Sequence, residues 1–421
     1  MKKMIYDRLT GRETSLAVIG LGYVGVPVAL RFARCFDVVG YDMDARRIEK
    51  LREKYGAGCG SIRFTSLEEE LSRAAFYIVT VLTPVDERKN PDLTCLVEAT
   101  RTVARYLKRG DYVVYESTVS PGCTEEVCVP LLEKGSGLKL GADFKVGYSP
   151  ERINPNDSEH TFSNTAKIVS ANDGQALDEV ARVYAEVVAA DLCRASGIRV
   201  AEAAKMTENV QRSVNIALMN ELQRLFSRMG IDMGEVIDMA SSKWNFVKYR
   251  PGLGGGHCIP VDPLYLVSAA SKLGVEMPVT SSGCAVNDGM AAYVVRSLLG
   301  AMGSDGRGAR ALLMGVTYKE NIDDIRNSRI AEMVGLLERE GMSVDVTDPH
   351  ADPDKVYAMY GIRPVPALRP PYDLIVVAVA HDEYRGLDDA YFRSISRGAA
   401  LLGDIRGLYK GRIKSLGYWS L

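Results

Sequence analysis

Residues 16–32 read LAVIGLGYVGVPVALRF, in which an apolar run, a glycine-rich turn and a helix-forming segment follow one another directly. The turn has three glycines, Gly20, Gly22 and Gly25, at the spacing GxGxxG. This spacing allows a tight turn, a close backbone approach to a pyrophosphate, and close packing of helix on strand. The helix amino-terminus then presents free N–H groups to the phosphates. The pattern predicts a dinucleotide-binding Rossmann unit rather than a glycine turn with no ligand.

An acidic residue follows the next predicted strand, Val38–Tyr41. Asp42 stands 22 residues after Gly20, where a carboxylate accepts hydrogen bonds from the adenosine ribose. Because a carboxylate repels a 2′-phosphate, Asp42 favours NAD over NADP, although the nearby Arg47 is a cation of the kind that holds that phosphate. The residues expected to line this part of the cofactor site are Gly20, Gly22, Tyr23, Val24, Gly25, Asp42 and Arg47.

Short apolar runs alternate with longer mixed segments over the first 190 or so residues. This alternation is typical of βα units on a parallel sheet, whose strands are buried on both faces. The strands predicted here are Leu16–Ile19, Val38–Tyr41, Phe76–Leu82, Tyr112–Tyr115, Phe144–Tyr148 and Ala166–Ser170.

A long helix is predicted from Ser196 to Met229, because this stretch lacks proline and carries apolar residues at helical spacing. It ends at Gly230, and helical sequence continues to about Met302. After a linker at Gly303–Gly308, βα alternation restarts, with strands predicted at Ala311–Thr317, Val344–Thr347, Leu374–Ala380 and Leu401–Asp404. We expect an α/β protein with two Rossmann-like doubly wound domains, joined by the long helix and a helical middle domain. The expected domains are residues 1–195, 196–302 and 303–421.

The composition excludes several classes of protein. The 421 residues are 47% hydrophobic and 25% charged, with a net charge of −2, so a general nucleic-acid binder is not expected. No apolar stretch follows the charged start to make a signal peptide, and the longest aliphatic run, Leu374–Ala380, is too short to cross a bilayer. Eight scattered cysteines without a CxxC pair argue against a zinc cluster and a disulfide-stapled fold. We expect no metal and a cytoplasmic protein.

One cysteine differs from the other seven. Cys258 lies in PGLGGGHCIPVDP, a loop whose glycines let the backbone approach a ligand closely. A thiol needs cationic or hydrogen-bonding help to act as a nucleophile at neutral pH, and His257 and Asp262 are nearby in the sequence. The other seven cysteines are interpreted as small buried hydrophobic residues.

Polar residues on the long helix and at strand ends form a second group of candidates. Lys205 and Asn209 are four residues apart and share one helix face, which Arg212 extends. A solvated helix face is the alternative for this stripe. The stretches 116–118 (Glu-Ser-Thr) and 151–152 (Glu-Arg) follow predicted strands, where parallel sheets bind their ligands.

With these residues assembled, the sequence resembles the UDP-sugar 6-dehydrogenases of the UDP-glucose/GDP-mannose dehydrogenase family. The resemblance covers nearly the whole chain and rests on blocks that occur in order: VIGLGYVGVPVA, TPVDERKNPDLT, ESTVSPGCTEEV, YSPERINPND, AAKMTENVQRSVNIALMNEL, PGLGGGHCIPVDPLYL and GVTYKENIDDIRNS. It implies an amino-terminal NAD-binding Rossmann domain, a central helix that builds a homodimer, and a carboxy-terminal domain that binds the UDP part of the substrate.

The resemblance also implies a chemistry, in which NAD oxidises the C6 alcohol of a UDP-sugar twice to a carboxylate. Cys258 would attack the aldehyde formed first to give a thiohemiacetal. A second oxidation would make a thioester, which water hydrolyses. The uronic acid would serve as a precursor of a polysaccharide or other glycan.

Matching positions imply the remaining catalytic roles. Lys205 would stabilise oxyanion charge or move a proton, and Asn209 would help to hold that oxygen. Asp262 would act with Lys205 on a catalytic water, and Glu151 and Thr118 would position or activate water for hydrolysis. Which group serves as the base at each step stays open.

Other matching positions imply contacts with the ligands. Thr83, Thr118 and Arg326 match positions that contact NAD, and Lys319, with Tyr318 beside it, matches the position that binds the diphosphate. The further positions implied to lie near the UDP-sugar are Arg152, Lys205, Asn209, Arg212, Arg250, Gly255, His257 and Arg406.

Two blocks indicate which sugar is used. The stretch HCIPVDP is similar to the branch that acts on UDP-N-acetylhexosamines, and SPERINP is similar to the N-acetylglucosamine enzymes within it. We expect UDP-N-acetylglucosamine, with UDP-N-acetylmannosamine and then UDP-glucose as alternatives. A 3-hydroxyacid or 6-phosphogluconate-type dehydrogenase would need no cysteine nucleophile, and a silent nucleotide-sugar binder would need none of the catalytic residues.

Overall fold

The computed structural model describes residues 3–56, 60–153, 159 and 161–421. The chain forms two compact units. The amino-terminal unit comprises Met1–Glu208 and Leu264–Val275, and the carboxy-terminal unit comprises Asn209–Pro263 and Glu276–Leu421.

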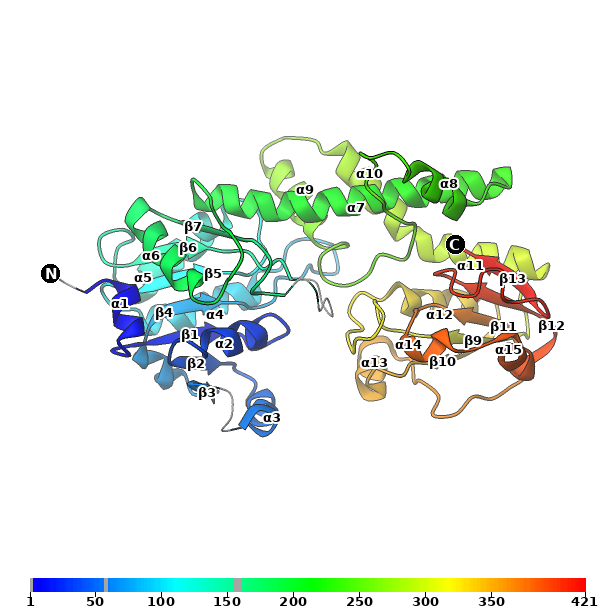
Figure 1. The fold of residues 1–421 in the computed structure, drawn as a ribbon, viewed down its shortest axis with the longest axis horizontal. Helices are drawn as coiled ribbons and strands as arrows, with labels where there is room; N and C mark the ends of the chain where they lie inside the picture. Colours follow the sequence, from blue (N-terminus) through cyan, green and yellow to red (C-terminus); the bar gives the residue numbers. More distant parts are fainter. Residues whose placement is uncertain (1–2, 57–59, 154–158, 160) are drawn as a thin grey trace. The chain divides into compact units, whose positions relative to one another are not determined.

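The amino-terminal unit is built on an eight-stranded sheet with the order β3-β2-β1-β4-β5-β6-β7-β8 (Figure 1). The chain runs outward from β1 to β3 and then returns to the other side of β1, so its direction across the sheet reverses between β1 and β4. In such sheets ligands bind at the carboxyl ends of the strands, at this reversal. The strands are β1 (Ser15–Ile19), β2 (Val38–Tyr41), β3 (Ile62–Thr65), β4 (Ala74–Val79), β5 (Tyr112–Tyr115), β6 (Lys145–Tyr148), β7 (Lys167–Ala171) and β8 (Leu192–Arg194).

The six strands predicted for this region are confirmed to within three residues at each end. Strands β3 and β8, which are short and include polar residues, were not predicted. One pair departs from the parallel arrangement that the alternation indicated, because β7 runs antiparallel to β6. Apolar runs indicate burial but not strand direction, and the described part of the β6–β7 connection contains no crossover helix.

Two hydrophobic cores cover the two faces of this sheet. Leu16 and Val18 of β1 face one core, whereas Ala17 and Ile19 face the other, as the two-residue repeat of a strand requires. Helices α2 (Gly25–Phe32) and α6 (Gly174–Ala185) pack in the first core, and α4 (Thr94–Tyr106) and α5 (Val129–Ser136) pack in the second. The other helices of this sheet domain are α1 (Ile5–Thr10) and α3 (Ala45–Tyr55).

The carboxy-terminal unit contains a second sheet, in the order β10-β9-β11-β12-β13, with every pair of neighbours parallel. Its four predicted strands are confirmed, and β13 was missed. The strands are β9 (Arg310–Met314), β10 (Ser343–Thr347), β11 (Tyr372–Val377), β12 (Ser396–Asp404) and β13 (Gly417–Ser420). The helices that connect them are α12 (Arg329–Arg339), α13 (Pro353–Tyr360), α14 (Asp382–Arg385) and α15 (Asp389–Ile395).

The predicted long helix is confirmed as α7 (Ile198–Met229), which has 32 residues and is followed by Gly230, where φ is +70° (Figure 1). Four more helices complete the helical middle: α8 (Met233–Ala240), α9 (Asp262–Lys272), α10 (Pro278–Asp288) and α11 (Met290–Met302). The α/β class with two doubly wound sheets and a helical middle is therefore confirmed. Among the described residues, no helix combines the length and apolar character needed to span a membrane.

Candidate active site

The three glycines after β1 have the geometry that each position of the motif requires. Gly20 has a φ of +92°, which makes the tight turn. A Cβ at Gly22 would meet nothing within 4 Å, so the backbone is open to a ligand there. A Cβ at Gly25 would lie 1.9 Å from the Gly20 carbonyl oxygen, so only glycine permits this packing of α2 on β1. The loop therefore fits a bound dinucleotide pyrophosphate.

Asp42 is fixed beside this loop. It is 5% exposed, and its carboxylate accepts hydrogen bonds from the backbone N–H groups of Leu21 at 2.8 Å and Asp44 at 3.0 Å. The guanidinium of Arg47 donates to the same carboxylate at 2.8 Å. The Arg47 charge is thus paired with Asp42 and is not free to bind a 2′-phosphate. This arrangement favours a ribose hydroxyl, and therefore NAD.

The loops after β4 and β5 meet at the carboxyl edge of the sheet. The Thr83 hydroxyl donates to the Thr118 carbonyl oxygen at 2.6 Å, and the Ser117 hydroxyl donates to the Val81 carbonyl oxygen at 2.7 Å. The structure thus brings together Thr83 and Thr118, which the sequence placed in separate motifs.

Glu151 lies at the rim of a buried ionic network. Its Oε1 accepts hydrogen bonds from the backbone N–H groups of Arg152 at 2.7 Å and Ile153 at 2.6 Å. Its Oε2 lies 3.3 Å from the ammonium of Lys167, which is 3.1 Å from Glu116. These contacts hold the Glu151 carboxylate in one orientation. Residues 154 and 155, which complete SPERINP, lie outside the described residues.

Glu116 and Lys167 are buried partners that the sequence analysis did not identify as a pair. The Tyr184 hydroxyl donates to Glu116 at 2.5 Å. Burial raises the pKa of Glu116 to about 6, although the Lys167 charge opposes this rise. For Lys167, burial alone would lower the pKa, but the Glu116 and Glu151 carboxylates outweigh it and raise the pKa. A lysine at the beginning of the buried strand β7 was the one sequence signal of this network.

Arg152, predicted to lie near the sugar, makes an ion pair and a hydrogen bond within the amino-terminal unit. Its guanidinium pairs with Glu208 at 2.7 Å and donates to the Ala166 carbonyl oxygen at 2.7 Å. These bonds connect the Glu151 loop to α7.

The predicted stripe on α7 is partly buried. Lys205 is 7% exposed, and no described residue forms an ion pair with it, which argues against a solvated helix face. One turn further along α7, the Asn209 amide donates to the Asp262 carboxylate at 2.5 Å. Arg212, further along the same helix, is exposed.

Cys258 lies on the turn that leads into α9. Its carbonyl oxygen accepts a hydrogen bond from the Asp262 N–H at 2.9 Å, so the thiol-bearing residue and the carboxylate belong to one helical turn. Asp262 is 4% exposed, whereas Cys258 is exposed. Cys258, Asp262 and Asn209 therefore form a compact group in the carboxy-terminal unit.

The glycine loop before Cys258 packs against the loop after β9. A Cβ at Gly255 would lie 2.9 Å from Tyr318 Cβ, and one at Gly256 would lie 2.8 Å from the Tyr318 ring. The Asn327 amide donates to the Gly256 carbonyl at 3.0 Å, and the Gly256 N–H donates to the Arg326 carbonyl at 3.2 Å. The predicted substrate residues Gly255 and Tyr318 are therefore in contact.

His257 and Arg326 lie in the same region. The Arg326 guanidinium makes two hydrogen bonds to Asp324, at 2.8 and 2.5 Å. Burial, together with the Arg326 charge, lowers the pKa of His257 to about 4, so this ring is neutral at pH 7. Its Nε2 atom is buried and has no hydrogen-bond partner among the described residues.

Two further arginines predicted near the substrate differ in their placement. The exposed Arg406 has Nη1 only 3.6 Å from where a Cβ would stand on Gly252, so it lies against the glycine loop. Arg250 is exposed and pairs with Asp238 of α8 at 3.3 Å.

The other cysteines only partly match their interpretation as buried hydrophobic residues. The seven described cysteines form no disulfide bond with one another, and Cys123 and Cys128 are buried. Cys95 and Cys193 are exposed, so the interpretation was wrong for these two. Cys59 lies outside the described residues.

The sequence matches the NAD-binding, central and UDP-binding domains of one dehydrogenase family over residues 14–188, 199–289 and 312–411. The chain belongs to the UDP-glucose/GDP-mannose dehydrogenase family. The glycine turn, Asp42 and Glu151 fall in the NAD-binding domain of this family, and Cys258 falls in its central domain. Lys319 falls in its UDP-binding domain.

Two family members are similar to this chain over most of its length. It is 44% identical over 411 residues to a UDP-N-acetyl-D-glucosamine 6-dehydrogenase of Pseudomonas aeruginosa, with 94% of this chain and 97% of that protein covered. It is 43% identical over 408 residues to the enzyme of the same name from Salmonella typhi, covering 94% and 96%. The structure of a UDP-N-acetyl-D-mannosamine dehydrogenase from Pyrococcus horikoshii matches with a TM-score of 0.87 at 29% identity, covering 96% of this chain and 98% of that one.

Proposed function

We propose that this protein is an NAD-dependent UDP-N-acetyl-D-glucosamine 6-dehydrogenase, which oxidises the C6 hydroxyl of its substrate to a carboxylate. The observation that carries the proposal is the 43–44% identity, over 94% of the chain, to two enzymes of that name. The exposed Cys258, bonded through its turn to Asp262, supports the two-step oxidation, because a one-step dehydrogenase needs no nucleophilic thiol.

Bound NAD would supply the hydride acceptor. The glycine turn at Gly20–Gly25 would hold its pyrophosphate and Asp42 its ribose, with Thr83, Thr118 and Arg326 as further contacts. The Cys258 sulfur would add to the aldehyde carbon as a nucleophile, and the thiohemiacetal would lose a second hydride to become a thioester. Hydrolysis would release the acid and restore the thiol.

The surrounding side chains would control charge and water in these steps. Lys205, buried without an ion-pair partner among the described residues, would face developing negative charge on the substrate oxygen. Asn209 would hold the same oxygen while its amide anchors Asp262. Glu151, held by two backbone N–H groups and by Lys167, would orient the hydrolytic water together with Thr118.

The UDP part of the substrate would bind the carboxy-terminal unit. Lys319 and Tyr318 would contact the diphosphate, and Arg406 would supply a further cation beside the glycine loop. His257 is neutral at pH 7 and has a buried ring nitrogen, which suits a hydrogen bond to an uncharged sugar substituent. Arg152, Arg212, Arg250 and Gly255 complete the proposed surroundings of the sugar.

UDP-N-acetyl-D-mannosamine is the second candidate substrate, because the Pyrococcus horikoshii structure shares the fold over 96% of the chain. Its identity of 29% is well below the 43–44% of the glucosamine enzymes, so we rank it second. UDP-glucose ranks third.

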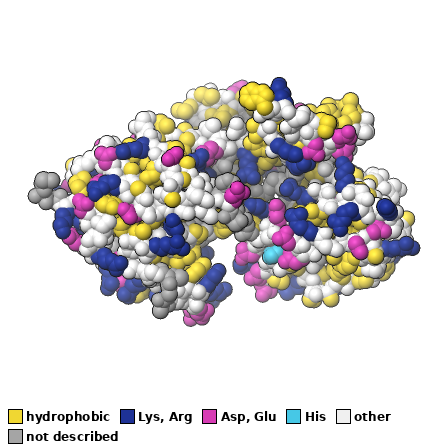
Figure 2. Space-filling model, viewed as in Figure 1, with side chains coloured by type: hydrophobic (Ala, Val, Ile, Leu, Met, Phe, Trp, Pro, Cys, Tyr) yellow, Lys and Arg dark blue, Asp and Glu magenta, His cyan; other side chains and the backbone are white. Residues whose placement is uncertain are grey.

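We propose that the chain works as a cytoplasmic homodimer, with residues 1–195, 196–302 and 303–421 as its domains. Leu218, Leu225 and Met229 lie along one face of α7 and are 48%, 52% and 59% exposed, which supports pairing through this helix. The absence of disulfide bonds among the described cysteines fits a reducing compartment. Positive and negative side chains are interspersed over the face drawn in Figure 2, which supports a small-molecule substrate rather than nucleic acid.

Substrate preference is tested by measuring kcat/KM with NAD for UDP-N-acetylglucosamine, UDP-N-acetylmannosamine and UDP-glucose. The proposal requires the highest value with UDP-N-acetylglucosamine. A clearly higher value with either of the other two would overturn it. No turnover with any of them, together with thermal stabilisation by NAD, would indicate a silent binder.

A further inference from the structure

We propose that His381 and Asp348 are positioning residues that hold the loop after β9 in the shape that binds the substrate diphosphate. The proposal rests on the proposed function, because that loop, Val316–Asn321, carries Tyr318 and Lys319. Neither His381 nor Asp348 is predicted to touch the ligand.

The topology places both residues where this sheet binds its ligand. The order β10-β9-β11-β12-β13 means that the chain leaves β9 on one side, for β10, and returns on the other, at β11. Ligands of such sheets bind at the carboxyl ends of the strands beside this reversal. Asp348 follows β10 and His381 follows β11, so the two flank the loop that follows β9.

The His381 ring is fully buried, and both of its nitrogens have hydrogen-bond partners. Its Nδ1 accepts a hydrogen bond from the Asn321 N–H at 3.0 Å, so the ring is neutral and the proton is on Nε2. That Nε2 lies 3.2 Å from an Asp348 carboxylate oxygen and 3.2 Å from the Thr317 hydroxyl. The Thr317 hydroxyl in turn donates to the Lys319 carbonyl at 2.9 Å.

Asp348 holds the beginning of the loop, at Val316 and Thr317, whereas His381 holds its end, at Asn321. One carboxylate oxygen accepts hydrogen bonds from the Val316 N–H at 2.6 Å and the Thr317 N–H at 3.1 Å. The other oxygen accepts from the N–H groups of His350 at 2.8 Å and Ala351 at 2.9 Å. Burial alone would raise the pKa of Asp348, but the hydrogen bonds from His381 and the Val316 N–H outweigh it and hold the pKa well below its usual value.

The pair therefore fixes the loop at both ends, with Lys319 between them. Asn321 itself has a φ of +58°, and its side-chain oxygen accepts a hydrogen bond from the Asp382 N–H at 3.0 Å. Asparagine is among the non-glycine residues that adopt this left-handed conformation most readily, and the hydrogen bond to Asp382 holds its side chain in place. Losing the acceptor on His381 would remove the hydrogen bond of the partly buried Asn321 N–H and release this end of the loop.

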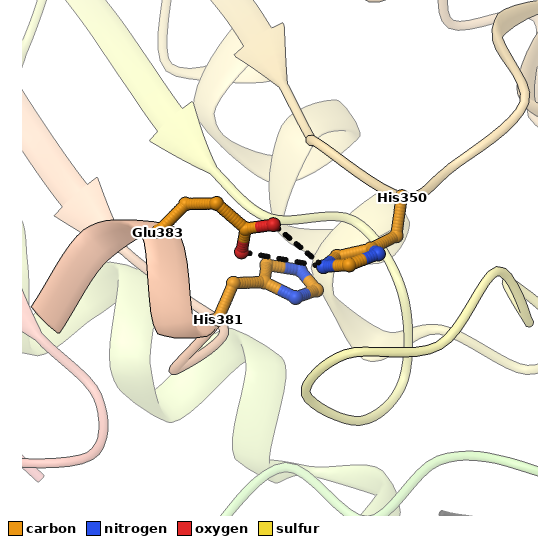
Figure 3. Close-up of side chains that lie close together, drawn as sticks. All are labelled: His350, His381 and Glu383. Carbon is orange, nitrogen blue, oxygen red and sulfur yellow. Dashed lines mark hydrogen bonds and ion pairs between the residues drawn. The ribbon is translucent and has the colours of Figure 1, made fainter.

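A metal ion is a weaker interpretation of the same cluster. His350, His381 and Glu383 lie close together, and the His350 Nε2 is 3.2 Å from the Glu383 carboxylate (Figure 3). However, the Nδ1 lone pair of His381 is used by Asn321, and its Nε2 carries the proton. A metal would have to break one of these hydrogen bonds.

The test compares UDP and NAD affinities of the full-length protein and its variants by calorimetry. His381→Leu removes the acceptor and should weaken UDP binding about tenfold, the effect of one lost hydrogen bond. His381→Asn keeps an acceptor near the Nδ1 position and should restore most of that affinity. NAD affinity should stay unchanged in both variants. His350→Gln, which alters the neighbouring ring whose centroid is 4.8 Å from that of His381, is the matched control and should bind UDP as the wild type does.

Thr317→Val provides a second, milder variant if His381→Leu does not fold, because it removes only the hydroxyl between His381 and Lys319. It should weaken UDP binding about threefold, and an unchanged affinity in the folded variants would overturn the proposal. A lower melting temperature without a change in UDP affinity would mean that the pair is merely structural. If the wild-type protein does not bind UDP, the proposed function is wrong. If the wild type binds UDP and His381→Leu binds it equally well, only the positioning role is wrong. Tighter binding of UDP on adding Zn²⁺ would favour the metal interpretation and overturn the proposal.

Discussion

Replacing Lys167 by methionine would expose the energetic role of the buried network beside Glu151. Lys167 is 3% exposed and pairs with two carboxylates, at 3.1 and 3.3 Å. Removing one partner of a buried ion pair costs about 3–5 kcal/mol, because the remaining charge is left unpaired. The methionine keeps the apolar stem, which limits the change mainly to charge.

Glu116 limits this loss, because it can take up a proton. Protonating a carboxyl group whose ordinary pKa is 4.5 costs about 3.4 kcal/mol at pH 7 and about 0.7 kcal/mol at pH 5. We therefore expect Lys167→Met to lower the free energy of unfolding by about 3 kcal/mol at pH 7 and by about 1 kcal/mol at pH 5. The double variant Glu116→Gln with Lys167→Met buries neither charge, and should recover most of the loss at both pH values.

Urea denaturation with two probes measures this effect. Both tryptophans, Trp244 and Trp419, belong to the carboxy-terminal unit, so fluorescence follows that unit while circular dichroism follows both. At an m-value of about 2 kcal/mol/M, the dichroism transition of the amino-terminal unit should move down by about 1.5 M urea at pH 7. The fluorescence transition should move less. An unchanged dichroism transition, or a double variant less stable than Lys167→Met, would refute the reasoning.

Three other predictions concern single residues. Cys258→Ser should bind NAD and UDP-sugar but form no acid product by mass spectrometry, since a hydroxyl is a far poorer nucleophile; acid production at the wild-type rate would contradict the thioester route. Asp42→Ala should raise the KM for NAD about tenfold through the lost ribose hydrogen bonds, and an unchanged KM would exclude that role. The folded-state pKa of His257, about 4, lies below its ordinary 6.5, so its contribution to stability is lost as pH falls from 6.5 towards 4. Between pH 7 and pH 5, the free energy of unfolding should fall by about 2 kcal/mol more in the wild type than in His257→Gln, as measured by fluorescence-detected urea unfolding. Equal decreases in the two proteins would refute this.

Local patterns in the sequence predicted the parts of the fold that depend on neighbouring residues. The glycine spacing at Gly20–Gly25 predicted a turn whose three positions have the required geometry, because each role depends on a few adjacent backbone atoms. The length of α7 followed from its helical periodicity. Strand direction did not, since β7 has the same apolar composition whether it runs parallel or antiparallel to β6.

Contacts between residues far apart in the chain could not be predicted from the sequence. Glu116 and Lys167 are 51 residues apart and become partners only through the order of the strands. Asp348 and His381 are 33 residues apart, and each is simply a polar residue after a strand. Applying the rule of strand-order reversal to the second sheet would have singled out this pair, whereas nothing in the sequence shows that Arg152 and Arg250 pair with acidic residues.

The count of NADH formed per molecule of product tests the central claim most directly. Purified protein would be incubated with excess NAD and limiting UDP-N-acetylglucosamine, with NADH followed by absorbance and the product identified by mass. A four-electron oxidation through Cys258 predicts two NADH for each molecule of UDP-N-acetylglucosaminuronic acid, with no aldehyde released. One NADH per molecule, with an aldehyde or ketone as the final product, would contradict the account.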